Sequence, residues 1–167
     1  MARSQGNITV TLSVLDRLID LEPKSPVEAP LSRSQSVRLL KAAVHRDLEW
    51  LLNTRRIFLN ADESLKEVNR SLFVYGLADL STYSMGSAAD QAKLVRHLVN
   101  VIKLFEPRLA NVRVTPLDSS GGTGLQELRL RIDGMLLMDP SPEPVSFDTL
   151  IELKSGVCRI AGGADAR

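Results

Sequence analysis

Residues 128–133, Leu-Arg-Leu-Arg-Ile-Asp, alternate strictly between apolar and charged side chains. A period of two indicates a β-strand that has one face in the core and one face in water. Residues 112–115 and 145–153 alternate in the same way, and Gly134 is placed to form a bulge. The last third of the chain therefore predicts three or four short, mainly antiparallel strands, with residues 119–124 as a glycine-rich loop between two of them.

Two helices are predicted ahead of these strands. Apolar residues recur every three or four positions along residues 36–53 and again along residues 88–105, which is the pattern of a helix with one buried face. Ser87, with Asp90 three residues later, is a helix-start signature, and Pro107 ends the second helix. Because helices and strands each have one apolar face, we expect an α+β fold with two main helices on one face of the sheet.

The chain divides into three regions on the same grounds. Residues 1–35 are predicted to be an N-terminal arm, with a short helix capped by Ser13 and a linker rich in proline. Residues 36–160 form the α+β domain, and residues 161–167 are predicted to be a disordered tail.

Composition narrows the possible functions. Of the 167 residues, 21 are basic and 20 acidic, a balance that provides no general attraction to nucleic acid or to an anionic membrane. No stretch is apolar enough for a signal peptide or a membrane span, so we expect a cytoplasmic location. The single cysteine, Cys158, cannot form an internal disulfide, and its apolar neighbours predict a buried thiol.

Three segments together resemble one family. They are residues 44–56, Val-His-Arg-Asp-Leu-Glu-Trp-Leu-Leu-Asn-Thr-Arg-Arg; residues 75–80, Tyr-Gly-Leu-Ala-Asp-Leu; and residues 105–109, Phe-Glu-Pro-Arg-Leu. In this order and spacing they resemble the TssE family of type VI secretion baseplate proteins, which is related to the phage baseplate wedge protein long labelled "lysozyme-like". The resemblance covers roughly residues 13–153.

The resemblance implies a structural subunit, without cofactor, that joins a baseplate to the first ring of a contractile sheath. The implied partners are the wedge proteins TssF and TssG, with TssK as a further candidate, and the sheath subunits TssB and TssC. Such a protein would be a monomer in isolation, bound to the membrane-docked apparatus only through its partners. Glu106, Pro107 and Arg108 are implied to lie where the subunit meets TssF and TssG.

The Glu106–Pro107–Arg108 motif has two physical interpretations. Proline fixes the backbone directly after a helix, so the carboxylate and the guanidinium project in set directions. They could form a salt-bridged helix end that closes the fold, or a rigid polar knob for a partner. The resemblance favours partner contact, and the two roles are compatible.

The sheet suggests a second contact surface. The strand at residues 145–153, or its neighbour at residues 125–132, is predicted to lie at a sheet edge, where a partner strand can add to unpaired backbone groups. Val145, Phe147 and Ile151 on this strand are the candidate sheath-binding residues.

The alternative is a peptidoglycan hydrolase with Glu106 as its acid. Such an enzyme needs two carboxyl groups that flank the bond, with the acid in an apolar pocket. The charged Arg108 lies two residues from Glu106, and no second acid is marked as its partner among Glu49, Glu127, Asp133 and Glu152. His45 and His97 have no ligand-spaced neighbours, so no metal site is predicted, and Trp50 is expected in the core or a sheltered position.

Overall fold

The computed structural model describes residues 13–19, 32–57, 61–80, 83, 87–117, 127–139, 141–152 and 155–164. Its helices are α1 (Val14–Leu18), α2 (Arg33–Asn53) and α3 (Ala88–Phe105), with two single 3-10 turns, η1 (Val68–Arg70) and η2 (Leu72–Val74), between α2 and α3. The strands are β1 (Leu109–Pro116), β2 (Glu127–Leu136), β3 (Glu143–Glu152) and β4 (Cys158–Ala164).

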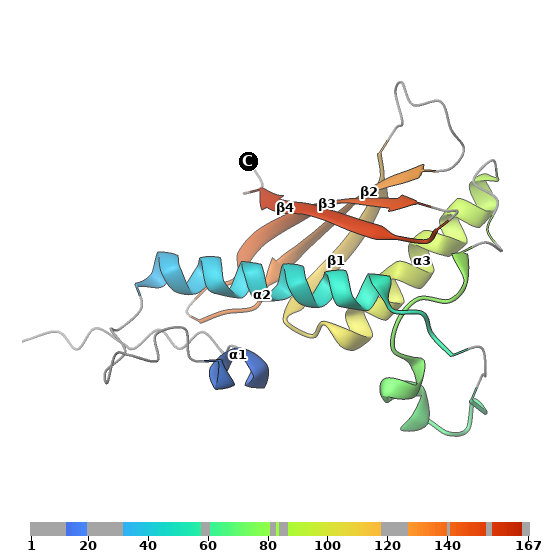
Figure 1. Ribbon diagram of the computed structural model, residues 1–167, viewed down its shortest axis with the longest axis horizontal. Helices are drawn as coiled ribbons and strands as arrows, with labels where there is room; N and C mark the ends of the chain where they lie inside the picture. The colour runs from blue at the N-terminus through green and yellow to red at the C-terminus, as the bar shows by residue number, and fades with distance from the viewer. Residues whose placement is uncertain are drawn as a thin grey trace, which may run out of the picture.

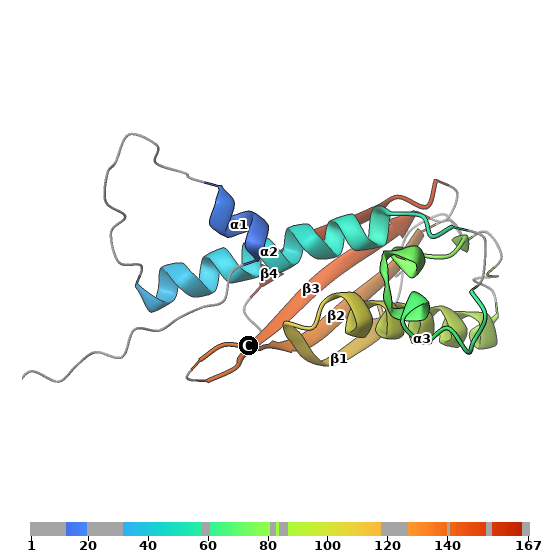
Figure 2. The ribbon, with the colours of Figure 1, turned by 90° about the horizontal axis from the view of Figure 1, so that it is seen from below.

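The described strands form one antiparallel sheet in the order β1-β2-β3-β4. Helix α2 packs against β4 and α3 packs against β1, so that both helices lie on one side of the sheet (Figure 1). Viewed from below, the two helices lie in front of the strands (Figure 2). The predicted α+β fold, with helices on one face of a small antiparallel sheet, is confirmed.

The core lies between the helices and this face. Alternate strand residues are buried there, as the period of two predicts, whereas Arg129, Arg131 and Asp148 lie on the open face. The largest fully buried side chains come from both layers: Phe147, Leu40, Leu48, Leu51, Leu52, Leu77, Leu94, Leu98, Ile102, Leu130, Ile132 and Leu136.

The helix ends follow local chemistry. The hydroxyl of Ser87 accepts a hydrogen bond from the Asp90 N–H at 3.3 Å and caps α3, as predicted. The predicted cap of α1 is also present, because Ser13 accepts from the Asp16 N–H at 3.1 Å. Helix α2 begins earlier than expected, at Arg33, since Ser32 and Gln35 form a reciprocal capping box.

The bulge lies opposite the residue that suggested it. Ala110 pairs with Met135 and Arg113 with Asp133, so Asn111 and Val112 of β1 together face Gly134 of β2. Asn111 takes the positive φ of 53°. The prediction placed the bulge on the wrong strand. The extra residue belongs to β1, and Gly134 of β2 lies opposite it.

The predicted edge position of residues 145–153 is wrong. Strand β3 pairs with β2 on one side and with β4 on the other, and β2 also lies inside the sheet. Val145, Phe147 and Ile151 are 2%, 1% and 0% exposed. The edges of the described sheet are β1 and β4.

Two further expectations need correction. Residues 161–164 were assigned to a disordered tail, but they extend β4 to Ala164 by pairing with β3, and residues 165–167 lie outside the described part. Trp50 is not sheltered: it is 51% exposed, with the Arg46 guanidinium 5.0 Å from its ring centre. The proline-rich linker and the loop at residues 119–124 also lie outside the described residues.

None of the described helices is both long enough and apolar enough to cross a membrane.

Candidate protein-interaction site

The Glu106–Pro107–Arg108 motif forms the corner between α3 and β1. Glu106 is the C-cap of α3: its N–H donates to the Ile102 carbonyl at 2.8 Å, and its own carbonyl accepts from the Leu109 N–H at 3.1 Å. Proline at 107 cannot continue the helix, so the chain turns at once into β1. The backbone of the corner therefore has little conformational freedom.

Glu106 and Arg108 bind each other at two points. Arg108 Nε donates to Glu106 Oε1 at 2.6 Å and Nη2 donates to Oε2 at 2.5 Å, while the Arg108 N–H reaches Oε1 at 3.3 Å. Glu106 is only 3% exposed. A fork-to-carboxylate pair of this kind is among the stronger hydrogen-bonded arrangements in proteins, and it fixes both side chains.

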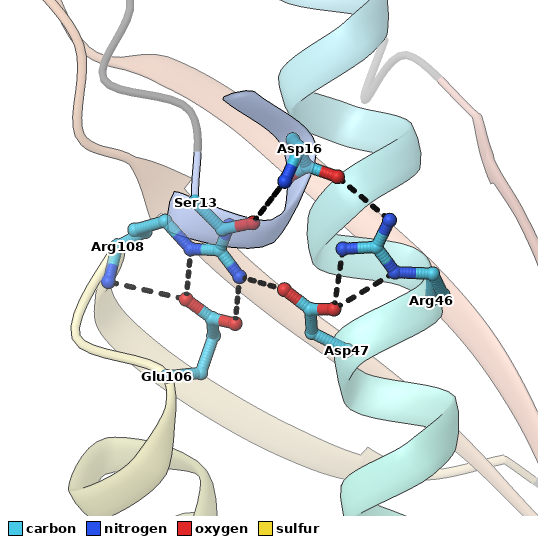
Figure 3. A network of polar contacts seen from close by, with 6 residues as sticks. All are labelled: Ser13, Asp16, Arg46, Asp47, Glu106 and Arg108. Carbon is cyan, nitrogen blue, oxygen red and sulfur yellow. Dashed lines mark hydrogen bonds and ion pairs between the residues drawn. The ribbon is translucent and has the colours of Figure 1, made fainter. Parts of the chain in front are cut away.

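The pair continues into α2 and α1 (Figure 3). Arg108 Nη2 also donates to Asp47 Oδ2 at 2.5 Å, and the other oxygen of Asp47 accepts from Arg46 Nε at 3.0 Å and from Arg46 Nη2 at 2.8 Å. Arg46 Nη1 donates to Asp16 of α1 at 2.7 Å. We call this chain of alternating charges, Glu106–Arg108–Asp47–Arg46–Asp16, the corner network.

Charge alternation in the corner network shifts the pKa values of Arg108, Arg46 and Asp16 in consistent directions. Hydrogen bonds to Glu106 and then to Asp47 raise the pKa of Arg108 despite partial burial. Arg46 lowers the pKa of Asp16, and Asp16 and Asp47 raise the pKa of Arg46. The charged forms of Arg108, Arg46 and Asp16 are therefore favoured.

The three segments that resemble TssE meet at this corner. Residues 44–56 supply Asp47, and residues 105–109 supply the motif itself. From residues 75–80, Tyr75 packs edge-on against Phe105 with ring centres 5.1 Å apart, and burial, with Asp47 and Glu106 nearby, raises the pKa of its hydroxyl. Backbone hydrogen bonds of 2.9 Å join Leu77 to Thr54 and to Arg56.

One nitrogen of the corner has no hydrogen-bond partner among the described residues. Arg108 Nη1 is enclosed and makes no hydrogen bond within the described part of the chain. A buried donor left without an acceptor carries a free-energy cost of about 1–3 kcal/mol. Because the nitrogen is enclosed, this cost is carried within the corner itself.

The other predicted residues lie elsewhere. Val145, Phe147 and Ile151 belong to the core side of β3, and they take no part in the corner. Conversely, prediction missed Asp47, Arg46 and Asp16 as site residues. The adjacent charges of Arg46 and Asp47 were visible on a predicted helix, but nothing local indicates a partner 61 residues further along the chain.

Neither histidine has the surroundings of a metal ligand. His45 Nε2 lies 3.0 Å from the Ile160 carbonyl, and the Ala78 N–H approaches His97 Nε2 at 3.5 Å. Burial, with Arg56 nearby, lowers the pKa of His97. Within the described residues no group of three metal-ligating side chains occurs. Cys158 is 1% exposed, as predicted, and burial raises the pKa of its thiol to about 12.

Fold and site together define a two-layer α+β domain whose helix-end corner is held by its own ion pairs. The chain belongs to the family of the baseplate wedge protein gp25, which matches residues 38–141 and thus more than half of the chain. Searches of curated proteins and of solved structures found no match. The family is a structural component of baseplates, so the protein has a baseplate role that involves contact with other baseplate proteins.

Proposed function

We propose that the protein is a TssE-type baseplate subunit of a bacterial type VI secretion system. The observation that carries the proposal is the gp25 match over residues 38–141, together with the TssE-like segments that converge on the corner. In this role it joins the wedge proteins TssF and TssG to the sheath subunits TssB and TssC and helps to initiate sheath assembly. It acts in the cytoplasm, reaches the membrane-docked apparatus through its partners, and is a monomer in isolation, with TssK as a further candidate partner.

The corner is the proposed contact with TssF and TssG. The rigidity of Glu106, Pro107 and Arg108 supports this assignment, since a side chain that is already held in place loses little entropy on binding. The side chains of Arg108 and Asp47 are 21% and 23% exposed, so part of the corner is accessible to a partner. The same residues also brace the fold, so both interpretations of the motif are retained.

The proposed role includes no catalytic step. Glu106, the acid of the hydrolase alternative, has both carboxylate oxygens hydrogen-bonded to Arg108 and is almost fully enclosed. A general acid must reach the oxygen of the leaving group in a bound sugar chain. Clearing of a cell-wall suspension that is lost in Glu106→Gln but retained in Glu49→Gln would contradict the structural assignment.

The test is affinity capture of partners from the native cytoplasm. Wild-type protein is expected to recover TssF, TssG and the sheath subunits. Arg108→Ala is expected to lose TssF and TssG but to keep the sheath, which serves as an internal check that the variant is folded. Lys93→Ala, which removes an exposed ion pair with Asp90, is the matched control and is expected to keep both.

Two outcomes would count against the proposal. Wild-type protein that recovers none of these partners would overturn the type VI assignment. An Arg108→Ala variant that recovers TssF and TssG as well as Lys93→Ala does would show that the wedge proteins bind elsewhere.

A further inference from the structure

Helix α1 lies against the domain with a polar side chain inward and its apolar side chains outward. The side chain of Asp16 is 13% exposed, whereas Val14, Leu15, Leu18 and Ile19 are 64%, 45%, 77% and 47% exposed. An amphipathic helix ordinarily buries its apolar face against its own domain. The packing of α1 is the reverse, so burial of these four apolar side chains does little to hold the helix in place.

An ion pair joins α1 to the corner network. Arg46 Nη1 donates to Asp16 Oδ1 at 2.7 Å, while Nε and Nη2 of the same guanidinium donate to Asp47 (Figure 3). The Arg46 side chain is 30% exposed, so water and salt reach this ion pair. Ion pairs of this kind contribute little stability and weaken further as the salt concentration rises. The contact can therefore be broken at a small cost in free energy.

The helix is too short to persist once it leaves the domain. It has five residues, and isolated helices of fewer than about 12 residues are marginal in water. Docking and helix formation are therefore coupled. The Ile19 N–H donates to the Leu15 carbonyl at 3.2 Å, and protection of this amide reports whether α1 is docked.

Release of α1 would uncover a hydrogen-bond donor that is already held in position. Arg46 would keep its two hydrogen bonds to Asp47, the residue that also binds Arg108, and its Nη1 would lose its acceptor. The ring of Trp50, which is 51% exposed, lies 5.0 Å from the same guanidinium. Arginine and tryptophan are among the residue types that contribute most to affinity between proteins.

We propose that α1 is an autoinhibitory cover over the Arg46 end of the corner network. In the free protein Asp16 occupies the Arg46 donor, and α1 has to move away before TssF–TssG binds the corner. This inference rests on the proposed function, which puts TssF–TssG at the corner. The charge of Arg46 defines the group that replaces Asp16, a carboxylate of the partner. Only the open fraction of molecules can bind, so the cover lowers the apparent affinity.

Amide hydrogen exchange tests the cover in the free protein. Arg46→Ala removes the tie without changing α1 itself, and the Ile19 amide is expected to exchange about threefold faster in this variant than in wild type. Leu18→Ala, which shortens an exposed side chain, is expected to exchange like wild type. The Leu77 amide, bonded to the Thr54 carbonyl at 2.9 Å, is the internal reference. Equal exchange at Ile19 in Arg46→Ala and wild type would overturn the role of this ion pair.

A double-variant cycle tests the competition with the partner. Asp16→Ala is expected to bind purified TssF–TssG about threefold more tightly than wild type, because the cover no longer competes. In the Arg46→Ala background the same change is expected to have no effect, since the donor that Asp16 occupies is already missing. Binding by Asp16→Ala that is equal to or weaker than that of wild type would overturn the inference.

Failure of the inference can be told apart from failure of the proposed function. If neither wild type nor Asp16→Ala binds TssF–TssG, the proposed contact and the cover that depends on it are both refuted. If both bind with the same affinity, the proposed function stands and only the autoinhibitory role of α1 is refuted.

Discussion

Arg108 is the residue at which the corner network branches, since one guanidinium nitrogen serves both Glu106 and Asp47. Removing it leaves the carboxylate of Glu106 enclosed without a counter-charge. Loss of one partner of such a buried pair destabilises a protein by about 3 kcal/mol. We expect Arg108→Ala to lower the free energy of unfolding by that amount, measured by urea denaturation.

The control for this prediction is an exposed ion pair. The Lys93 side chain is 61% exposed beside Asp90, and Lys93→Ala is expected to change stability by less than about 0.5 kcal/mol. If Arg108→Ala and Lys93→Ala have similar effects, the corner network contributes nothing to the fold.

Asp16 makes the attachment of α1 depend on pH. The hydrogen bond from Arg46 lowers the pKa of Asp16 below its ordinary value of 3.8, so the folded-state pKa lies below the unfolded one. The stability that this contact contributes is therefore fully present above about pH 4 and is lost as the pH falls through the folded pKa. Amide chemical shifts of Leu15 and Leu18 are expected to move in that acidic window, and in Asp16→Asn the transition should be missing.

The thiol of Cys158 is predicted to be unreactive in the folded protein. Burial raises its pKa to about 12 from 9.0, so the thiol contributes stability below pH 9 that declines as the pH rises toward 12. At pH 8 we expect almost no reaction with a disulfide reagent until urea unfolds the chain. Rapid labelling of the native protein would contradict the burial of this side chain.

At the scale of elements, Gly76 lets the backbone after η2 approach the end of α2 closely. Its φ is +99°, and a Cβ added there would lie 2.4 Å from the Thr54 carbonyl oxygen. We expect Gly76→Ala to destabilise the fold by at least about 2 kcal/mol, from strain together with the backbone clash. Gly134→Ala, whose nearest neighbour would be 3.4 Å away, is the milder comparison, and thermal melts of both variants provide the test.

Most of the elements could be predicted because their signals are local. The hydroxyls of Ser13 and Ser87 mark helix starts, Pro107 marks an end, and alternation marks the strands. Strand order could not be predicted in this way. In a sheet covered on one face only, a central strand such as β3 alternates as clearly as an edge strand does. The exposure of Trp50 could not be predicted, because the spacing of apolar residues along a helix does not show which of its residues other elements cover.

The candidate site was predictable only in part, for a related reason. The motif itself is contiguous, and its proline signals a fixed corner. The partner of Arg108, however, is Asp47 on another helix, and the link from Arg46 to Asp16 spans a further 30 residues. Contacts of this kind arise from packing between elements, and a single sequence carries no periodic signal for them.

At the scale of the whole molecule, the proposed baseplate contacts should stabilise the fold. Anything that binds the folded chain alone raises its stability by mass action, by about 2.7 kcal/mol at a hundred times the Kd. We expect a purified TssF–TssG complex to raise the Tm of the wild-type protein. An unchanged Tm at saturating concentration would argue against binding. The Lys93→Ala variant should show the same rise as the wild type.

The burial of Cys158 has a practical consequence for following assembly in real time. It is the single cysteine of the chain and its side chain faces the core. We therefore expect the folded natural protein not to react with maleimide dyes. Leu72 in η2 is 80% exposed and belongs neither to the corner nor to either sheet edge. A Leu72→Cys substitution would accept one fluorophore at one defined place, and single particles could then be counted as they join a growing baseplate.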